Sequence, residues 1–136
     1  MPEKEKFDWC DYYQLGKSYQ NEDDIAKLRT GINRFYFSSF LKSRDYLLEN
    51  NIFLDSTSKK IMNSTSGKVR SETRNIFKKH PNLNVSKKGE KIAKELDNLH
   101  NYRNLVDYDA EKPKNIKNAF NYCKSRAKKY LIYWMN

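Results

Sequence analysis

The sequence predicts an all-α protein, an antiparallel helical bundle of about five helices that forms a single domain over residues 1–136. Apolar residues recur at helical spacing through most of the chain. The chain has only 4 glycines and 3 prolines and no strict alternation of apolar and polar residues, which argues against a β-sandwich or barrel. Hydrophobic residues make up 38% of the chain, which is enough for a packed core and too much for a disordered tail.

The longest predicted helix begins near residue 25 and ends at Asn50–Asn51, after residues 21–24 have supplied a cap and acidic side chains that suit a helix N-terminus. Before it, residues 7–19 predict a short aromatic-rich helix that is broken near Gly16. After it, residues 54–66 are typical of a polar loop with at most one turn of helix. The apolar face of the long helix comprises Ile25, Leu28, Ile32, Phe35, Tyr36, Ser39, Phe40, Ser43, Tyr46 and Leu47.

Three more helices are expected in the second half of the chain. The third is stopped by Pro81, the fourth is capped by Ser86, and the fifth is entered through Pro113. The apolar positions of the third are Val69, Thr73, Ile76 and Phe77, and those of the fourth are Ile92, Leu96, Leu99 and Val106. The apolar positions of the fifth are Ile116, Ala119, Phe120, Cys123, Ala127, Tyr130, Leu131 and Trp134.

The net charge of +10 is concentrated in two basic segments. Residues 59–94 carry 11 basic and 2 acidic side chains, and residues 112–129 carry seven basic and no acidic ones. Residues 1–58 and 95–111 are net acidic, at −2 and −4. Clustered basic charge attracts polyanions by counterion release, so nucleic acid is the expected partner. The alternative is a solvated lysine face, and an anionic membrane surface is disfavoured because the basic segments lack an adjacent strongly apolar face.

Several classes of protein are excluded by what the sequence lacks. No apolar run reaches about 18 residues, so no transmembrane helix is expected. No apolar segment follows the first six residues, so we expect no secretory signal and a cytoplasmic protein. Cys10 and Cys123 lie far apart, and His80 and His100 stand alone, so we expect free thiols, no metal site and no cofactor.

One residue breaks the apolar stripe of the fourth helix. The stripe continues through position 103, where Arg103 stands in place of an apolar side chain. His100 and Asp107 lie three residues before it and four after it, on nearly the same face. A guanidinium group on a core-facing position must be paired or must serve a function. The two readings are an internal Arg103–Asp107 ion pair and a polar site at the end of the bundle or at a dimer interface.

The same residues resemble a known family. Residues 100–109, His-Asn-Tyr-Arg-Asn-Leu-Val-Asp-Tyr-Asp, resemble the late-helix signature of HEPN-domain proteins, in the subgroup with an Arg-Asn-x-x-Asp-Tyr-Asp form. Residues 29–40, Arg-Thr-Gly-Ile-Asn-Arg-Phe-Tyr-Phe-Ser-Ser-Phe, resemble the second-helix pattern of that family, and residues 9–19 resemble its first helix. The resemblance covers roughly residues 7–125.

The resemblance implies an antiparallel bundle that often dimerises. Many members of the family are RNA-binding proteins or metal-independent endoribonucleases of toxin–antitoxin and phage-defence systems. Metal-free cleavage needs a base, an acid and a cation, roles that histidine and arginine fill well. The active members carry a His four to six residues after the Arg, whereas no His follows Arg103. The candidate catalytic residues are therefore Arg103, Asn104, Asp107, Tyr108 and His100.

A second segment fits the family's spacing more literally. Arg74 is followed by a polar Asn75 and, six positions after the Arg, by His80, although Pro81 also marks a helix end where a His commonly lies. Asn33 and Arg34 form a third polar pair that could face Arg103 across the bundle. The candidate RNA-binding residues are Arg34, Arg70, Arg74, Lys78, Lys79 and His80.

These observations favour a homodimeric HEPN-like protein that binds or cleaves RNA. The alternative is a non-catalytic helical adaptor for a nucleotidyltransferase antitoxin or another protein partner, in which Tyr108 would be a modification target as in related toxins. A DNA-binding protein is a third class, but no helix–turn–helix with a glycine turn is evident.

Overall fold

The computed structural model describes residues 6–135 and confirms the all-α class. Within that range no strand occurs, and a short 3-10 helix (Pro81–Leu83) is the one non-α helical element. The six α-helices are α1 (Cys10–Lys17), α2 (Ile25–Glu49), α3 (Ser56–Met62), α4 (Lys68–Lys79), α5 (Lys88–Tyr108) and α6 (Ile116–Met135).

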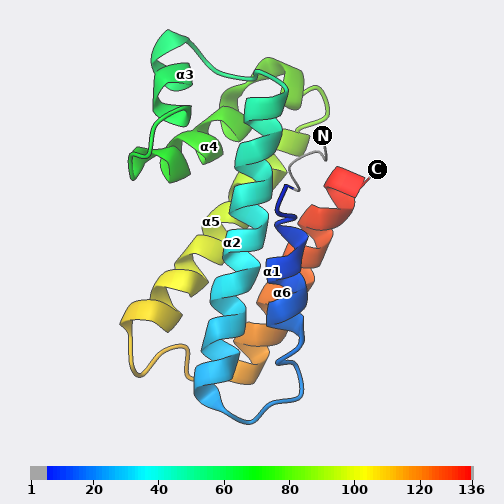
Figure 1. The fold of residues 1–136 in the computed structure, drawn as a ribbon, viewed down its shortest axis with the longest axis vertical. Helices are drawn as coiled ribbons and strands as arrows, with labels where there is room; N and C mark the ends of the chain where they lie inside the picture. Colours follow the sequence, from blue (N-terminus) through cyan, green and yellow to red (C-terminus); the bar gives the residue numbers. More distant parts are fainter. Residues whose placement is uncertain (1–5, 136) are drawn as a thin grey trace, which may run out of the picture.

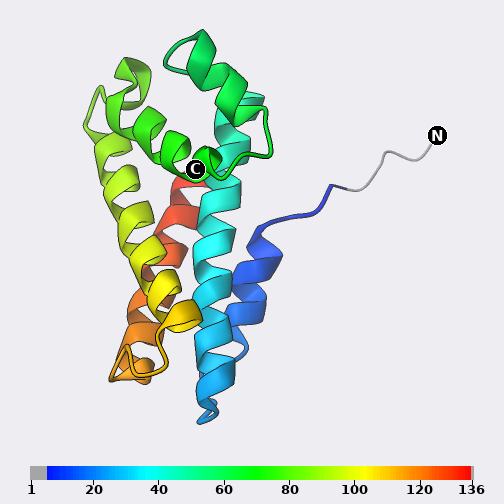
Figure 2. The ribbon, with the colours of Figure 1, turned by 90° about the vertical axis from the view of Figure 1, so that its left-hand side faces the viewer.

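Helix α2 is the centre of the bundle and packs against α1, α4, α5 and α6. Figure 1 shows α2, α5 and α6 along the long axis of the molecule, with α5 antiparallel to the other two. The turned view in Figure 2 shows α3 and α4 lying across one end of these long helices. The molecule therefore consists of an elongated bundle of long helices, with the shorter helices α3 and α4 packed across one end (Figures 1 and 2).

The sequence predicted the bounds of α2 correctly. The Asp24 carboxylate accepts a hydrogen bond from the Ala26 N–H at 2.9 Å, so it caps the first turn as expected. At the other end Asn51 adopts a left-handed backbone with φ of 54° directly after the last turn, a conformation that asparagine tolerates better than most residues. The local signals at both ends of α2 therefore agree with the tertiary structure.

Two details of the sequence prediction are wrong. Residues 54–66 contain α3 rather than a loop with a single turn, because Asp55 caps the Ser58 N–H at 2.7 Å and buried Met62 packs on α4. The sulfur of Met62 lies 3.6 Å from the hydroxyl of Thr73 on α4. Ser86 does not cap α5, since the N-cap residue is Lys87, with a left-handed φ of 59°.

The corner between α4 and α5 is closed by Asn84. Its Nδ2 donates to the carbonyl oxygens of Phe77 and His80, each at 2.9 Å, and of Lys78 at 3.2 Å. Its Oδ1 accepts from the Glu90 N–H at 2.8 Å. One side chain thus satisfies free carbonyls at the end of α4 and a free N–H at the start of α5.

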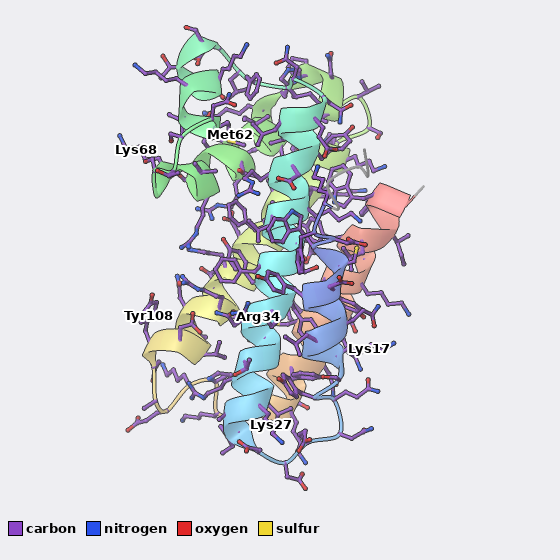
Figure 3. The ribbon with its side chains drawn as sticks, viewed as in Figure 1. Lys17, Lys27, Arg34, Met62, Lys68 and Tyr108 are labelled. Carbon is purple, nitrogen blue, oxygen red and sulfur yellow. The ribbon has the colours of Figure 1, made fainter. Side chains whose placement is uncertain are left out.

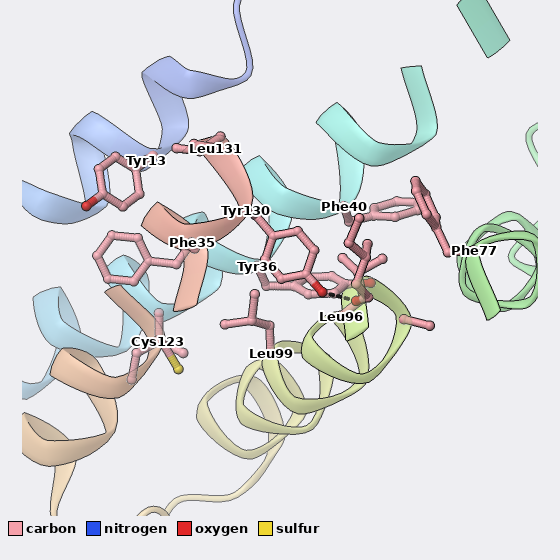
Figure 4. Packing of buried hydrophobic residues seen from close by; sticks show 14 of the residues in the cluster. Tyr13, Phe35, Tyr36, Phe40, Phe77, Leu96, Leu99, Cys123, Tyr130 and Leu131 are labelled. Carbon is pink, nitrogen blue, oxygen red and sulfur yellow. Dashed lines mark hydrogen bonds between the residues drawn. The ribbon is translucent and has the colours of Figure 1, made fainter. Parts of the chain in front are cut away.

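The core is rich in aromatic residues from α1, α2, α4 and α6 (Figure 4). Phe35 of α2 packs against Tyr13 and Phe120, with ring centroids 5.4 and 5.1 Å away. The buried hydroxyl of Tyr130 donates to the carbonyl oxygen of Ile92 and so ties α6 to α5. Cys123 is fully buried, and burial raises the pKa of its thiol to about 12. The thiol is therefore a packing group and not a nucleophile.

Candidate functional site

Arg103 lies on the face of α5 that packs against α2, as the interrupted stripe predicted. The neighbouring stripe residues Leu99 and Val106 are buried, and the Arg103 side chain is itself only 12% exposed. A long arginine can bury its aliphatic stem while its charged head lies near the surface. The guanidinium group is therefore held in a fixed place rather than moving freely in solvent.

The predicted ion pair between Arg103 and Asp107 is present. The Arg103 Nε lies 2.9 Å from the Asp107 Oδ2, but its N–H does not point at that oxygen, so the contact is an ion pair without a hydrogen bond. The Arg103 Nη1 donates to the Asn104 Oδ1 at 3.2 Å. The guanidinium group thus retains N–H donors that these two neighbours do not use.

Three arginines from three helices gather around one aromatic ring. The guanidinium carbons of Arg103 on α5, Arg70 on α4 and Arg34 on α2 lie 5.5, 5.6 and 5.8 Å from the centroid of the Phe37 ring. Each distance is within the range of a cation–π contact. We call Arg34, Arg70 and Arg103 the arginine cluster. Figure 3 marks Arg34 midway along α2 and Tyr108 near the end of α5.

The arginine cluster is poorly neutralised. Across residues 6–135, Arg34 and Arg70 form no ion pair with a carboxylate, and Asp107 pairs only with Arg103. Asn33 of α2 orients that carboxylate, because its Nδ2 donates to the two Asp107 oxygens at 3.0 and 3.3 Å. Three positive charges beside one negative charge make a site that attracts anions.

Two buried polar atoms of the site lack hydrogen-bond partners. They are the Oδ1 of Asn33 and the Nε of Arg103, counted over the part of the chain that the structure describes. Most buried polar groups in folded proteins are hydrogen-bonded, and exceptions require an explanation. Both atoms belong to the contact among Asn33, Asp107 and Arg103 that joins α2 to α5.

His100 lies one turn before Arg103, beside the arginine cluster. Its ring centroid is 5.5 Å from that of buried Tyr36 on α2. Burial lowers the pKa of His100, and the charges of Arg74, Arg103 and Arg70 lower it further, whereas Asp97 opposes them. Histidine normally titrates near pH 6.5, so this imidazole is neutral at pH 7 and can accept a proton.

Tyr108 is the most exposed aromatic residue of the site. Its side chain lies at the end of α5, is 77% exposed, and has its ring centroid 5.5 Å from the Arg103 guanidinium carbon. An exposed aromatic face beside a cation is suited to stack on a planar group of a ligand.

Arg29 of α2 holds the end of α5 and the loop after it in place. Its Nη1 donates to the carbonyl oxygens of Val106 and Asp109, at 2.9 and 2.8 Å. Its Nη2 donates to those of Ala110 and Lys112, at 3.2 and 3.0 Å. These carbonyls belong to the end of α5 and the loop that follows, so Arg29 fixes the helix end that carries Asp107 and Tyr108.

The remaining predicted site residues lie outside the arginine cluster. Arg74 pairs with Asp97, with its Nε 2.7 Å from Oδ1, and Lys78 and Lys79 are exposed. The Nδ1 of His80 accepts the Asn82 N–H at 3.2 Å, as part of the turn after α4. Arg74 and His80 are thus bonded to different partners, Arg74 to α5 and His80 within its own turn.

Sequence reasoning missed the role of Phe37. The expected apolar face of α2 omitted this residue, and the structure leaves it only partly buried. The available signal was a large aromatic residue outside the apolar stripe of the helix, one turn after Arg34. The cluster itself could not be read from the sequence, because Arg34, Arg70 and Arg103 come from three separate helices.

Other features of the described residues bear on function. Among residues 6–135, His, Cys, Asp and Glu side chains nowhere gather in threes as they would around a metal ion. None of the helices in that range combines the length and apolar character that a membrane crossing requires. A cavity of about 730 Å³ lies between the start of the chain and α2, α5 and α6, and no predicted site residue lines it.

Comparison with protein-family models, with curated proteins and with solved structures gave no match for this chain.

Proposed function

We propose that the chain is an RNA-binding protein in which the arginine cluster binds a phosphate group of the RNA backbone. The observation that carries the proposal is the convergence of three guanidinium groups on Phe37 with one carboxylate in contact. Guanidinium groups bind phosphate oxygens through paired N–H donors. A phosphate would also relieve the repulsion between the three arginines.

Two further features support RNA over another anion. Exposed Tyr108 next to Arg103 offers a face on which an unstacked base can lie, as is common in the recognition of single-stranded RNA. The net charge of +10 supplies long-range attraction for a polyanion. Binding of a small acidic metabolite would need neither an exposed aromatic face nor a large net positive charge, so both features favour RNA.

Metal-independent cleavage is the narrower form of the proposal. Neutral His100 would take the proton of a 2′-hydroxyl group of the RNA. The 2′-oxygen would at the same time attack the adjacent phosphorus. The arginine cluster would stabilise the charge that develops on the phosphate oxygens. The bond from phosphorus to the 5′-oxygen then breaks, and that oxygen needs a proton, for which Tyr108 is the candidate donor. The products are a 2′,3′-cyclic phosphate and a free 5′-hydroxyl.

The test is incubation of the purified protein with structured RNA in EDTA, beside an Arg103→Ala variant. We expect the wild type to bind RNA and to release fragments with cyclic phosphate ends, and Arg103→Ala to bind about tenfold or more weakly and to release no fragments. Arg44→Ala is the matched control, because Arg44 lies on the same α2 helix as Phe37 but pairs with its neighbour Asp45. Binding without fragments would leave a non-catalytic RNA-binding protein, and absence of binding at low salt would reject RNA as the partner.

The adaptor alternative is favoured by one observation, the exposure of Tyr108. A nucleotidyltransferase partner would have free access to its hydroxyl. This alternative predicts that the wild type binds no RNA even at low salt, and that Arg103→Ala behaves like the wild type in the RNA assay.

The resemblance to HEPN-domain proteins supports the remaining parts of the proposal. It supports a homodimer that acts in a toxin–antitoxin or phage-defence system.

A further inference from the structure

The two basic segments of the sequence meet in space, on a different side of α5 from the arginine cluster. The segment 59–94 ends on the first turns of α5, and the segment 112–129 includes most of α6. Helices α5 and α6 pack against each other, and a cavity of about 440 Å³ opens between them. The acidic segment 95–111 separates the two in sequence but not in the fold.

Three lysines line this cavity. Lys91 and Lys94 of α5 and Lys129 of α6 line it and are exposed, and none of the three forms an ion pair within residues 6–135. We call the cavity and these three residues the α5–α6 groove. Unpaired lysines on two facing helices offer point charges at which phosphate groups of a backbone can be neutralised.

Aromatic rings lie between these charges. Tyr122 and Tyr133 of α6 line the groove, and both are only partly buried. The Arg126 guanidinium carbon lies 5.0 Å from the Tyr122 ring centroid, and the Lys88 Nζ lies 4.7 Å from that of Tyr133. Alternation of cations and aromatic faces is typical of surfaces that bind single-stranded nucleic acid.

One carboxylate lies in the groove, and it is paired with an arginine. The Glu95 Oε1 pairs with the Arg126 Nη1 at 3.1 Å, whereas the buried Oε2 has no partner among the described residues. The pair with Arg126 neutralises Glu95, so the three lysines of the groove remain available for phosphate groups.

We propose that the α5–α6 groove is a second RNA contact, in which Lys91, Lys94 and Lys129 bind backbone phosphates while the faces of Tyr122 and Tyr133 stack on bases. This inference rests on the proposed function, because it assigns a second site on the same ligand. The two sites are centred about nine residues apart on α5, or about 14 Å at 1.5 Å per residue. A strand that reaches both must pass around α5, so the groove lengthens the RNA that one chain can hold.

The test uses a fluorescein-labelled single-stranded RNA of about 20 nucleotides, longer than the ~4–16 nucleotides that one small domain contacts. The dissociation constant is measured against salt concentration for the wild type and for the triple variant K91Q/K94Q/K129Q. The matched control is K17Q/K60Q/K128Q, which removes three exposed lysines outside the groove and changes the net charge equally.

We expect the groove variant to lower the salt slope by about 2, since each single-strand phosphate contact contributes about 0.7. If the two lines meet near 1 M salt, that slope corresponds to about hundredfold weaker binding at about 0.1 M. We expect the control to change the salt slope by less than about 0.7, the contribution of one phosphate contact. Inorganic polyphosphate should compete less well per phosphate than unlabelled RNA of the same sequence.

Equal slopes for the groove variant and the control would overturn the inference. If Arg70→Gln still weakened binding in that case, the proposed function would stand without the groove. If the wild type bound no RNA at low salt, the proposed function would fail first. Equal competition by polyphosphate would overturn the assignment of stacked bases to the groove.

Discussion

Arg103 shows how one side chain can satisfy a structural and a functional reading together. Its stem occupies a core-facing position of α5, its Nε is paired with Asp107, and its guanidinium group lies over Phe37. The ion pair explains why the charge is tolerated at 12% exposure. It does not account for Arg34 and Arg70, which meet at the same ring without a carboxylate of their own.

The first prediction separates these readings by mutation of both members of the pair. Arg103→Ala and Asp107→Ala should each lower the free energy of unfolding by about 1–3 kcal/mol, since the pair is partly buried. Only Arg103→Ala should weaken RNA binding, by about tenfold or more, because a charged hydrogen bond is worth about 1.5–3 kcal/mol. Asp107→Ala should bind RNA at least as well as the wild type, since it removes the carboxylate that competes with phosphate.

Thermal melts and fluorescence anisotropy on the same preparations measure the two effects. Arg103→Lys should recover little binding, because a point charge cannot replace the planar fork of donors. Equal loss of RNA binding in Arg103→Ala and Asp107→Ala would show that the arginine acts through the fold alone.

The second prediction concerns acid stability and His100. Burial and three arginines lower its pKa in the folded state, so the unfolded chain takes up the proton first as the pH falls. Neutral His100 contributes its full share of stability above the ordinary pKa of about 6.5, which is that of the unfolded chain. This share is lost as the pH falls from that value toward the lower pKa of the folded state, and no further loss occurs below it.

We expect the free energy of unfolding to fall as the pH drops below about 6.5, by at most about 1.4 kcal/mol per pH unit for one proton. The profile of His100→Gln should be flatter over this range. Urea titrations at stepped pH measure it, with His80→Gln as the control for the loss of a histidine. A His100→Gln profile parallel to that of the wild type would contradict the depressed pKa.

At the scale of elements, the side chain of Asn84 links the end of α4 to the start of α5, in addition to the packing between the two helices. The third prediction is that Asn84→Ala lowers the free energy of unfolding by about 2 kcal/mol. It removes donors to three carbonyls and the acceptor for the Glu90 N–H, several of them at partly buried sites.

Asn82→Ala is the matched control, because Asn82 lies in the same turn, is exposed and makes no side-chain hydrogen bond among the described residues. Chemical denaturation measures both variants. If both lost the same small amount, the corner would be held by packing of Phe77 and the helices themselves.

At the scale of the whole molecule, two basic surfaces, the arginine cluster and the α5–α6 groove, lie on different sides of α5. The acidic segment 95–111 contributes Asp107 to the arginine cluster and Glu95 to the α5–α6 groove, so each basic surface contains one carboxylate. Both carboxylates pair with arginines, and each site retains cations beyond that pair. This arrangement suits a polyanion that touches two sides of the helix.

The fourth prediction is that the purified chain is a homodimer at micromolar concentration. In the family that it resembles, both subunits contribute an arginine to one shared cleft, and a second arginine cluster would double the charge at such a cleft. Light scattering coupled to size exclusion measures the mass. A mass near 16.3 kDa would contradict the shared cleft and leave one arginine cluster per RNA-binding unit.

The sequence by itself determined the fold class, five of the six helices and the position of Arg103 in an apolar stripe. Those properties depend on local spacing, because a residue three or four positions away on a helix lies on the same face whatever the rest of the chain does. The cap at Asp24 and the stop before Pro81 were readable for the same reason.

Tertiary structure alone decided where the arginines meet and what holds α3. Arg34, Arg70 and Arg103 converge because α2, α4 and α5 cross, and a pattern within one helix contains no information about the rotation of its neighbours. Helix α3 is polar in sequence and is stabilised by the contact of Met62 with α4, which exists only after the chain has folded. The meeting of the two basic segments at α5 and α6 has the same origin.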